Sequence, residues 1–273
     1  MFATLSGIVA ATRQRVDTAK RMVDLRALER KAESHNPRGF RRALEQKARS
    51  GVAVIAEIKK ASPSRGMIRG TLHVGSIASE LELAGAAALS VLTEEQFFHG
   101  GLSDLAEASA ATRLPCLRKD FIVDEFQLLE ARANGADAVL LILSALDDSE
   151  FSRFHRRSRE LGLDVLCEVH DERELQRALN LGAEIFGVNN RDLRTFAVDL
   201  GTSERLAEKI PAGALRVAES GIQGGADLRR LRACGYDAFL IGESLMRADN
   251  PGAELAMMLA ESVAVSRNVK REM

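Results

Sequence analysis

Charged and amide side chains stand at the ends of several short apolar runs of the sequence. In the first run Glu57 and Lys59, an acid and a base, are two residues apart. Side chains alternate between the two faces of a strand, so both should lie on one face. The same feature recurs at Lys119, Glu168, Asn189 and Glu219. Any one of these groups alone fits a solvated strand end or a structural ion pair equally well, but the recurrence predicts that they converge on one pocket.

Two glycine-containing turns follow later apolar runs and could bind an anion. They are Glu219-Ser220-Gly221-Ile222 and Ile241-Gly242-Glu243-Ser244. Glycine lets the backbone come close to a ligand, and backbone amides at the start of a helix donate hydrogen bonds to phosphate. Each glycine alone could serve only a tight turn, but the pair predicts a phosphorylated ligand. The carboxylate of Glu243 would have to turn away from that phosphate.

The motifs of common cofactor and metal sites are absent from the sequence. It contains no P-loop, no Gly-x-Gly-x-x-Gly that opens a βαβ unit, no His-Glu-x-x-His and no cluster of His and Cys ligands. The five histidines stand apart. His99 and His170 lie near predicted strand ends, where we expect them at the surface or behind the site. We therefore expect neither a metal nor an organic cofactor.

The sequence from about residue 52 onward repeats one pattern that could position these side chains. A short run rich in Val, Ile and Leu is followed by a loop and a longer amphipathic segment, as in a βα unit. The runs are 52–57, 88–92, 115–118, 138–142, 164–168, 185–189, 215–219 and 238–242. Continuous apolar strands joined by helix-length segments indicate a parallel sheet with right-handed crossovers. Eight units favour an α/β fold of the closed (β/α)8 or TIM-barrel type, with a doubly wound sheet as the alternative.

A barrel of this type would bring the polar residues together. Known (β/α)8 enzymes have their sites at the carboxyl ends of the strands, and many bind phosphate after strands seven and eight. The charged residues end their apolar runs, and the two glycine turns follow the seventh and eighth runs. We therefore expect one site at the carboxyl end of the barrel.

Residues 1–50 are predicted to form a helical extension ahead of the barrel. A rough helical stripe is formed by Leu5, Ile8, Val9, Val16 and Met22. A second short helix is expected near residues 40–48, and the extension could cover an end of the barrel. No Pro-rich, Gly/Ser-rich or like-charge linker interrupts the chain, so residues 1–273 are expected to form a single domain.

Composition favours a small-molecule partner. The formal net charge is -1 and basic residues are interspersed with acidic ones, which argues against nucleic acid and anionic membrane as partners. No apolar run is long enough to span a membrane, and no signal peptide is evident. Cys116, Cys167 and Cys234 form an odd, widely spaced set that we expect to act as small buried hydrophobes in a reducing cytoplasm.

Six segments together resemble the indole-3-glycerol-phosphate synthase family over nearly the whole chain. The segments are 55–64, 90–94 with Phe98 and Gly100, 117–122, 168–170, 187–191 and 219–222. Two features depart from the family pattern. Many relatives have Ser where this chain has Gly101, and the N-terminal stretch is only loosely similar. The first departure could loosen the loop after the second strand, and the second leaves open which N-terminal residues touch substrate.

The resemblance implies a carboxy-lyase of tryptophan biosynthesis that works without metal or organic cofactor. Its substrate would be 1-(2-carboxyphenylamino)-1-deoxyribulose 5-phosphate, converted to indole-3-glycerol phosphate, carbon dioxide and water by general acid-base catalysis. Lys119 would be the general acid at the ribulose carbonyl, and Glu168 the acid-base group of the dehydration. Lys59 would hold the substrate carboxylate, with the division of acid duties between the two lysines left open. Glu57 would orient Lys59, and Asn189 and Glu219 would position substrate groups.

The resemblance also assigns the binding residues. Phe98, Phe121 and Leu140 would form apolar walls for the anthranilate ring, although ordinary barrel core explains them equally well. The phosphate would be held by Ser62, Gly221, Gly242 and the backbone amide of Glu243. Ser220 would also bind substrate, and Arg191 is expected to join the ion pairs near Glu57 or Glu168.

Two alternative functions explain these residues less well. Another sugar-phosphate barrel would share the phosphate turns, but it would not explain Lys59 and Lys119 together with Glu168. A ligand-binding or scaffold protein that has lost catalysis would not be expected to keep the whole catalytic set. A monomer or a weak homodimer is expected.

Overall fold

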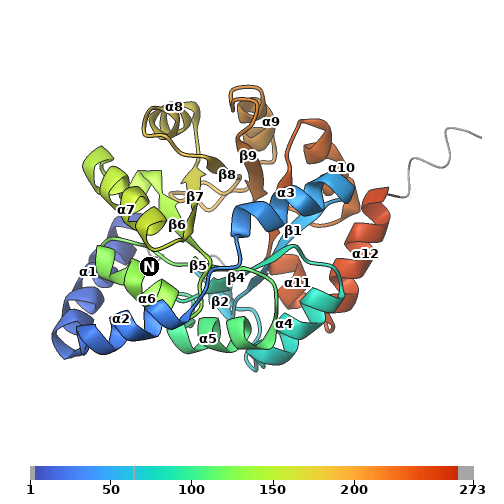
Figure 1. Cartoon of the computed structure of the whole chain (residues 1–273). Helices are drawn as coiled ribbons and strands as arrows, with labels where there is room; N and C mark the ends of the chain where they lie inside the picture. The colour runs from blue at the N-terminus through green and yellow to red at the C-terminus, as the bar shows by residue number, and fades with distance from the viewer. Residues whose placement is uncertain (1–3, 64, 264–273) are drawn as a thin grey trace, which may run out of the picture.

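The computed structural model describes residues 4–63 and 65–263 and places eight parallel strands in a closed barrel (Figure 1). The strands are β1 (Ala53–Ile58), β4 (Ala88–Leu92), β5 (Cys116–Lys119), β6 (Ala138–Ile142), β7 (Asp164–Val169), β8 (Ile185–Asn189), β9 (Leu215–Glu219) and β10 (Ala238–Ile241). Strand β1 closes the ring by pairing with both β4 and β10. The predicted barrel is confirmed and the doubly wound alternative is wrong. No predicted run differs from its strand by more than one residue at either end.

Helices form the outer layer of the barrel. They are α4 (Val74–Leu83), α5 (Leu102–Ala111), α6 (Glu125–Ala133), α7 (Asp148–Glu160), α8 (Glu172–Asn180), α9 (Gly201–Ala207), α10 (Gly225–Ala233), α11 (Glu243–Arg247) and α12 (Pro251–Val263). Asp124 and Asp147 begin α6 and α7 with capping boxes, which satisfy backbone N–H groups that a helix start leaves free. No helix in the described ranges is long and apolar enough to cross a membrane.

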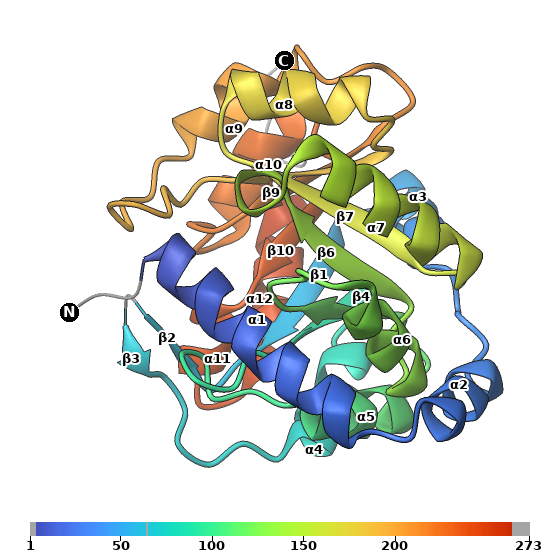
Figure 2. The same cartoon turned by 90° about the vertical axis from the view of Figure 1, so that its left-hand side faces the viewer.

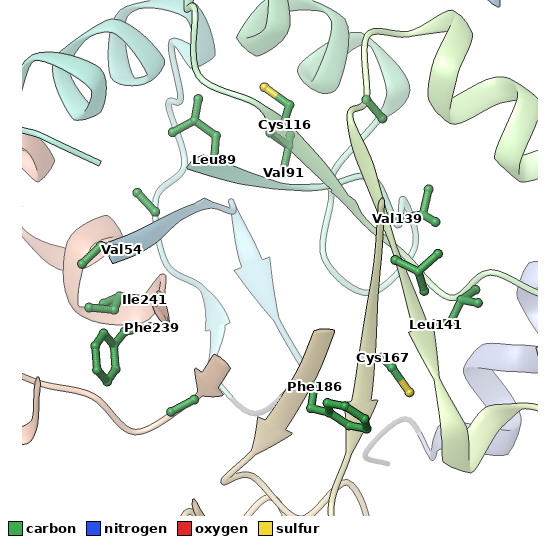
Figure 3. Close-up of a cluster of buried hydrophobic side chains, with 14 of the residues drawn as sticks. Val54, Leu89, Val91, Cys116, Val139, Leu141, Cys167, Phe186, Phe239 and Ile241 are labelled. Atoms are coloured by element: carbon green, nitrogen blue, oxygen red, sulfur yellow. The ribbon is translucent and has the colours of Figure 1, made fainter. Parts of the chain in front are cut away.

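The barrel strands separate two apolar layers because successive side chains point to opposite faces. Val54 on β1 packs outward, in the layer between strands and helices that Figure 3 shows in part. Its neighbour Ile55 packs inward, in the core of the barrel. Cys116 and Cys167 belong to the outer layer as small buried side chains, as predicted, whereas Cys234 at the end of α10 is half-exposed. The alternation that turns Ile55 inward also turns Glu57 into the barrel.

The N-terminal extension contains three helices and covers both ends of the barrel. These are α1 (Leu5–Met22), α2 (Leu25–Ser34) and α3 (Phe40–Ser50). Phe40 and Leu44 on α3 are fully buried in the core inside the barrel, next to the amino ends of the strands. Helix α1 begins at the opposite end, at the left in Figure 2, and crosses toward α6, while α3 lies at the right of the barrel.

Parts of the predicted extension differ from the structure. Ile8 and Val16 on α1 are buried as expected, but Met22 is 82% exposed because the last turn of α1 extends beyond the barrel. Helix α2 was not predicted. It packs against α6 with a short apolar stripe, in which Ala32 is buried and Leu28 is partly buried. Residues 1–3 of the predicted extension, Ser64 of the first family-like segment and residues 264–273 lie outside the described residues.

The amino end of the barrel should be required for stability and not for chemistry. Phe40→Ala is expected to lower the free energy of unfolding by about 3–5 kcal/mol, because it leaves a cavity at the end of the inner core. Urea unfolding measures the change. Leu83→Ala on α4 is the control, since Leu83 is 89% exposed and should change stability by no more than about 0.5 kcal/mol. An equal loss of unfolding free energy in the two variants would contradict the stabilising role of α3.

Candidate active site

One cavity of about 640 Å³ opens at the carboxyl end of the barrel. Every residue predicted for the site lines it: Glu57, Lys59, Ser62, Phe98, Lys119, Phe121, Leu140, Glu168, Asn189, Arg191, Glu219, Ser220, Gly221, Gly242 and Glu243. The lining also includes Leu5 and Ile8 of α1, whose contribution the sequence left open. The expected convergence on one pocket is therefore confirmed.

Lys119 lies between two buried carboxylates at the centre of this cavity. It is the last residue of β5, and its Nζ lies 2.9 Å from Glu168 Oε2 and 3.2 Å from Glu219 Oε2. Glu168 comes from β7 and Glu219 ends β9. Both carboxylates are almost completely buried. The three groups come from separate strands, so the barrel fixes their positions relative to one another.

Burial and charge act against each other on these three groups. Burial disfavours the Lys119 ammonium, but the carboxylates of Glu168, Glu219 and Glu57 outweigh it and raise the pKa of Lys119. Burial likewise disfavours the Glu168 carboxylate, yet Lys119 and His170 together lower the pKa of Glu168. Burial raises the pKa of Glu219 to about 7, with repulsion from Glu168 adding to it and attraction by Lys119 opposing it. At neutral pH the site thus holds a charged Lys119, an ionised Glu168 and a Glu219 that can carry a proton.

Glu57 and Lys59 form a second ion pair on the first strand. Lys59 Nζ lies 2.7 Å from Glu57 Oε1, and both side chains are largely buried. The Glu57 carboxylate also accepts a hydrogen bond from Ser90 on β4, whose hydroxyl lies 3.4 Å from Glu57 Oε2. The charge pairing expected between Glu57 and Lys59 is therefore present, and the orienting role of Glu57 stays a prediction.

Apolar side chains form one wall of the cavity. The rings of Phe98 and Phe121 lie with their centroids 6.3 Å apart and their planes tilted by 43°. Leu140 on β6 lies on the same cavity and also belongs to the inner core of the barrel. The pocket-lining and core alternatives for Leu140 are therefore both correct. A flat aromatic group could lie against these side chains.

The two glycine turns leave no room for larger residues. Gly242 approaches β1 so closely that an added Cβ would lie 2.5 Å from Glu57 Oε1. Gly221 has a φ of 83°, and an added Cβ there would lie 2.5 Å from Val198 Cγ1. Ser220, just before it, also has a positive φ of 66°. The backbone at this end of the cavity can therefore approach a ligand closely.

The expected place of Arg191 in the ion pairs near Glu57 or Glu168 is wrong. Its guanidinium Nη2 lies 3.4 Å from Glu243 Oε2. The guanidinium Nη1 also donates a hydrogen bond to the Phe196 carbonyl at 3.2 Å. The side chain is thus held between the loop after β8 and the start of α11.

Two further arginines share the Glu243 carboxylate. Arg65 Nε lies 3.0 Å and Arg247 Nη1 lies 3.4 Å from Glu243 Oε1. Both arginines line the cavity, and the sequence analysis missed them. Arg65 lies in an exposed turn and Arg247 ends the short helix α11, so neither stands at the end of an apolar strand run. The end of the cavity beside the two glycine turns is thus richer in positive charge than predicted.

His170 is the other contact that the sequence analysis underestimated. Its Nε2 lies 3.3 Å from Glu168 Oε1. His170 thus lies behind the cavity, which is one of the two locations expected for it. His99 is exposed, as expected. A signal for His170 was available, because it follows Glu168 by two residues, as Lys59 follows Glu57. In the described ranges, no three His, Cys, Asp or Glu side chains are placed to hold a metal ion.

Gly242→Ala should disturb the site without straining the backbone, because the φ of Gly242 is -131°. Its methyl group would displace Glu57 and with it Lys59, so kcat/KM is expected to fall by about 10²-fold. Steady-state kinetics with the substrate named under Proposed function measures the change. Gly70→Ala is the control, since no atom lies within 4 Å of its added Cβ. If the Gly242→Ala enzyme were as active as the Gly70→Ala enzyme, the close approach of Gly242 to Glu57 would not matter for activity.

Comparison with known proteins adds sequence and fold similarity to this geometry. Residues 5–258 match the family model described as indole-3-glycerol phosphate synthase. The indole-3-glycerol phosphate synthase of Koribacter versatilis is 54% identical over 95% of this chain and 100% of its own length. That of Burkholderia vietnamiensis is 49% identical over 93% and 98%. Among solved structures, thiamine phosphate pyrophosphorylase from Pyrococcus furiosus has a TM-score of 0.59 at 15% identity, over 78% of this chain and 96% of its own, and shows the fold alone.

Proposed function

Because the chain belongs to the indole-3-glycerol phosphate synthase family, we propose that its cavity carries out that reaction with Lys119 and Glu168 as the proton-transferring groups. The enzyme is a carboxy-lyase of tryptophan biosynthesis. It closes 1-(2-carboxyphenylamino)-1-deoxyribulose 5-phosphate into a ring and removes carbon dioxide and water to give indole-3-glycerol phosphate. The observation that carries the assignment of roles is the position of Lys119 between Glu168 and Glu219.

Lys119 acts as the general acid of ring closure. When the aromatic ring attacks the ribulose carbonyl, negative charge develops on the carbonyl oxygen, and an ammonium within hydrogen-bond reach stabilises and protonates it. Glu168 and Glu219 hold the ammonium in place and keep it charged. An alkoxide is a far stronger base than an amine, so a raised pKa of Lys119 does not prevent the transfer.

Glu168 acts in the dehydration that follows decarboxylation. It stays ionised in the free enzyme, so it can take a proton from the ring-closed intermediate and pass it to the departing hydroxyl. Glu219 positions a substrate hydroxyl. Its Oε1 is buried and has no hydrogen-bond partner within the described part of the chain, and burial raises the pKa of Glu219 to about 7. Asn189 assists in the positioning from the end of β8.

The remaining contacts bind the two ends of the substrate. Lys59, oriented by Glu57, holds the carboxylate of the anthranilate group and can share acid duties with Lys119. Phe98, Phe121 and Leu140 contact the aromatic ring.

At the opposite end of the cavity the phosphate is held by Ser62, Gly221, Gly242 and the backbone amide of Glu243, with Ser220 beside them. The nearby arginines, Arg191 among them, add positive charge there.

Several further features of the protein remain predictions. We expect residues 1–273 to form one domain, the protein to be a monomer or a weak homodimer, and nucleic acid not to be a partner. A cytoplasmic location follows from the cysteine pattern. Catalysis without metal or organic cofactor is expected from the chemistry assigned to the side chains.

The activity is tested by mixing the purified protein with the carboxyphenylamino-deoxyribulose phosphate in the presence of a chelator. The chain contains no Trp, so the appearance of indole fluorescence can be followed over a low background. We expect a rise that the chelator does not suppress. Saturable binding without any rise would indicate a barrel that has lost catalysis, and the absence of binding would contradict the substrate assignment.

A further inference from the structure

His170 connects the catalytic carboxylate to the first turn of a helix. It follows β7, and its side chain is only 14% exposed. On one side, Nε2 lies 3.3 Å from Glu168 Oε1. On the other, Nδ1 lies 3.0 Å from Oε2 of Glu174 on α8, which also accepts a hydrogen bond from the His170 backbone N–H at 2.9 Å. The imidazole therefore lies between two carboxylates.

The two oxygens of Glu168 have different partners. Oε2 lies 2.9 Å from Lys119 Nζ, and Oε1 faces His170. The contact with His170 is too oblique for a full hydrogen bond, and Nε2 has no hydrogen-bond partner in the described ranges. A small rotation would align it, and catalytic hydrogen bonds commonly tighten only when substrate is bound. The pair is thus placed to fix the plane of the Glu168 carboxylate.

Lys119 alone does not balance the charge around Glu168. Three carboxylates converge there from the strands: Glu57 on β1, Glu168 on β7 and Glu219 on β9. The ammonium of Lys119 is shared by Glu168 and Glu219, and Lys59 is paired with Glu57. Burial disfavours a charged imidazole, but the carboxylates of Glu168 and Glu174 outweigh it and raise the pKa of His170 to about 10. At neutral pH His170 supplies a second positive charge beside Glu168.

We propose that His170, oriented by Glu174, is a positioning residue that holds Oε1 of Glu168 and, as an imidazolium, keeps this carboxylate ready to accept a proton. The proposal rests on the role assigned to Glu168 under Proposed function. Lys119 serves ring closure on the other oxygen, while His170 serves the dehydration. His170 itself does not touch the substrate cavity.

His170→Gln removes the charge and leaves an amide that can still donate a hydrogen bond to Glu168. Loss of a neighbouring positive charge favours the protonated acid, so the pKa of Glu168 rises. The part of the acid limb of the kcat profile that belongs to Glu168, below the step of Glu219 near pH 7, should therefore move to higher pH by about 1–3 units. Well above that limb, kcat should change much less. An unshifted acid limb, even with a lowered kcat, would show a merely structural role and overturn the proposal.

Two controls separate this inference from the function on which it rests. His155→Gln removes a half-buried histidine that stacks on Phe151, away from the site, and should leave the pH profile unchanged. Glu168→Gln tests the role of Glu168 directly. If that variant turns over normally, the assignment of Glu168 fails. If it is inactive while His170→Gln has an unshifted profile, only the inference about His170 fails.

Reciprocity provides a second test that does not require the His170 variant to fold. If His170 stabilises the charged Glu168, then Glu168 stabilises the charged His170 by the same free energy. In the wild-type protein we expect the NMR titration of His170 near pH 10, and in Glu168→Gln a decrease of about 1–3 units. Titration of His170 at the same pH in both proteins would overturn the proposal.

Discussion

Lys119→Met is expected to lower kcat by about 10²–10⁴-fold, because it removes the donor to the developing alkoxide. Methionine retains an unbranched side chain of similar length, so the shape of the cavity should change little. The substitution leaves Glu168 and Glu219 buried without their common cation, and we expect the pair to retain a proton. Steady-state indole fluorescence measures the loss of turnover, and circular dichroism checks the fold.

A matched lysine provides the control for this variant. Lys20 on α1 makes an ion pair of 2.8 Å with Asp124, but this pair is exposed at the surface. Lys20→Met should therefore keep its activity and change stability by no more than about 1 kcal/mol. Binding of indole-3-glycerol phosphate to Lys119→Met should persist, since the phosphate and ring contacts remain. Near-normal turnover by Lys119→Met would exclude Lys119 as the acid.

Glu168→Gln is expected to reduce the formation of indole product by about 10²–10⁴-fold, because the amide cannot accept the proton that the carboxylate takes. Glutamine has the same shape as glutamate, so a loss of product formation would come from the missing carboxylate and not from altered packing. It also removes one of the two carboxylates that hold Lys119, which leaves Glu219 as the remaining direct partner of that ammonium among the described residues. Rates measured at saturating substrate separate the chemical step from binding.

The control for this variant is Glu172→Gln on α8, four residues from the catalytic carboxylate. Glu172 is 68% exposed and pairs with Lys209 at the surface, so its amide should behave as the wild type. Product formation by Glu168→Gln at the rate of Glu172→Gln would mean that another group performs the dehydration.

The barrel could be predicted closely from the sequence because its strands are buried on both faces. The run Ala138–Ile142 is apolar throughout and follows a turn that contains Asn134, Gly135 and Asp137, so its start is sharply marked. The extension was harder to predict. Helix α2 buries only Ala32 fully and Leu28 in part, so its apolar stripe is short among many charged residues.

The composition of the site was predictable, whereas its electrostatic arrangement was not. Polar residues at strand ends identified the cavity lining, since all parallel strands of a barrel end at one rim. Distances between strands are not encoded in local spacing. The sequence therefore did not show that Lys119 lies within 3.2 Å of both Glu168 and Glu219. The orientation of Arg191 also depends on contacts with Phe196 and Glu243 that no periodic pattern reveals.

The most direct test of the account is a single turnover in which carbon dioxide release and indole formation are followed separately. In the proposed mechanism Lys119 serves ring closure and Glu168 serves the later dehydration. Lys119→Met should therefore release neither product at an appreciable rate. Glu168→Gln should release about one carbon dioxide per site while indole fluorescence stays low. Carbon dioxide release by Lys119→Met at the wild-type rate, or prompt indole formation by Glu168→Gln, would contradict this division of roles.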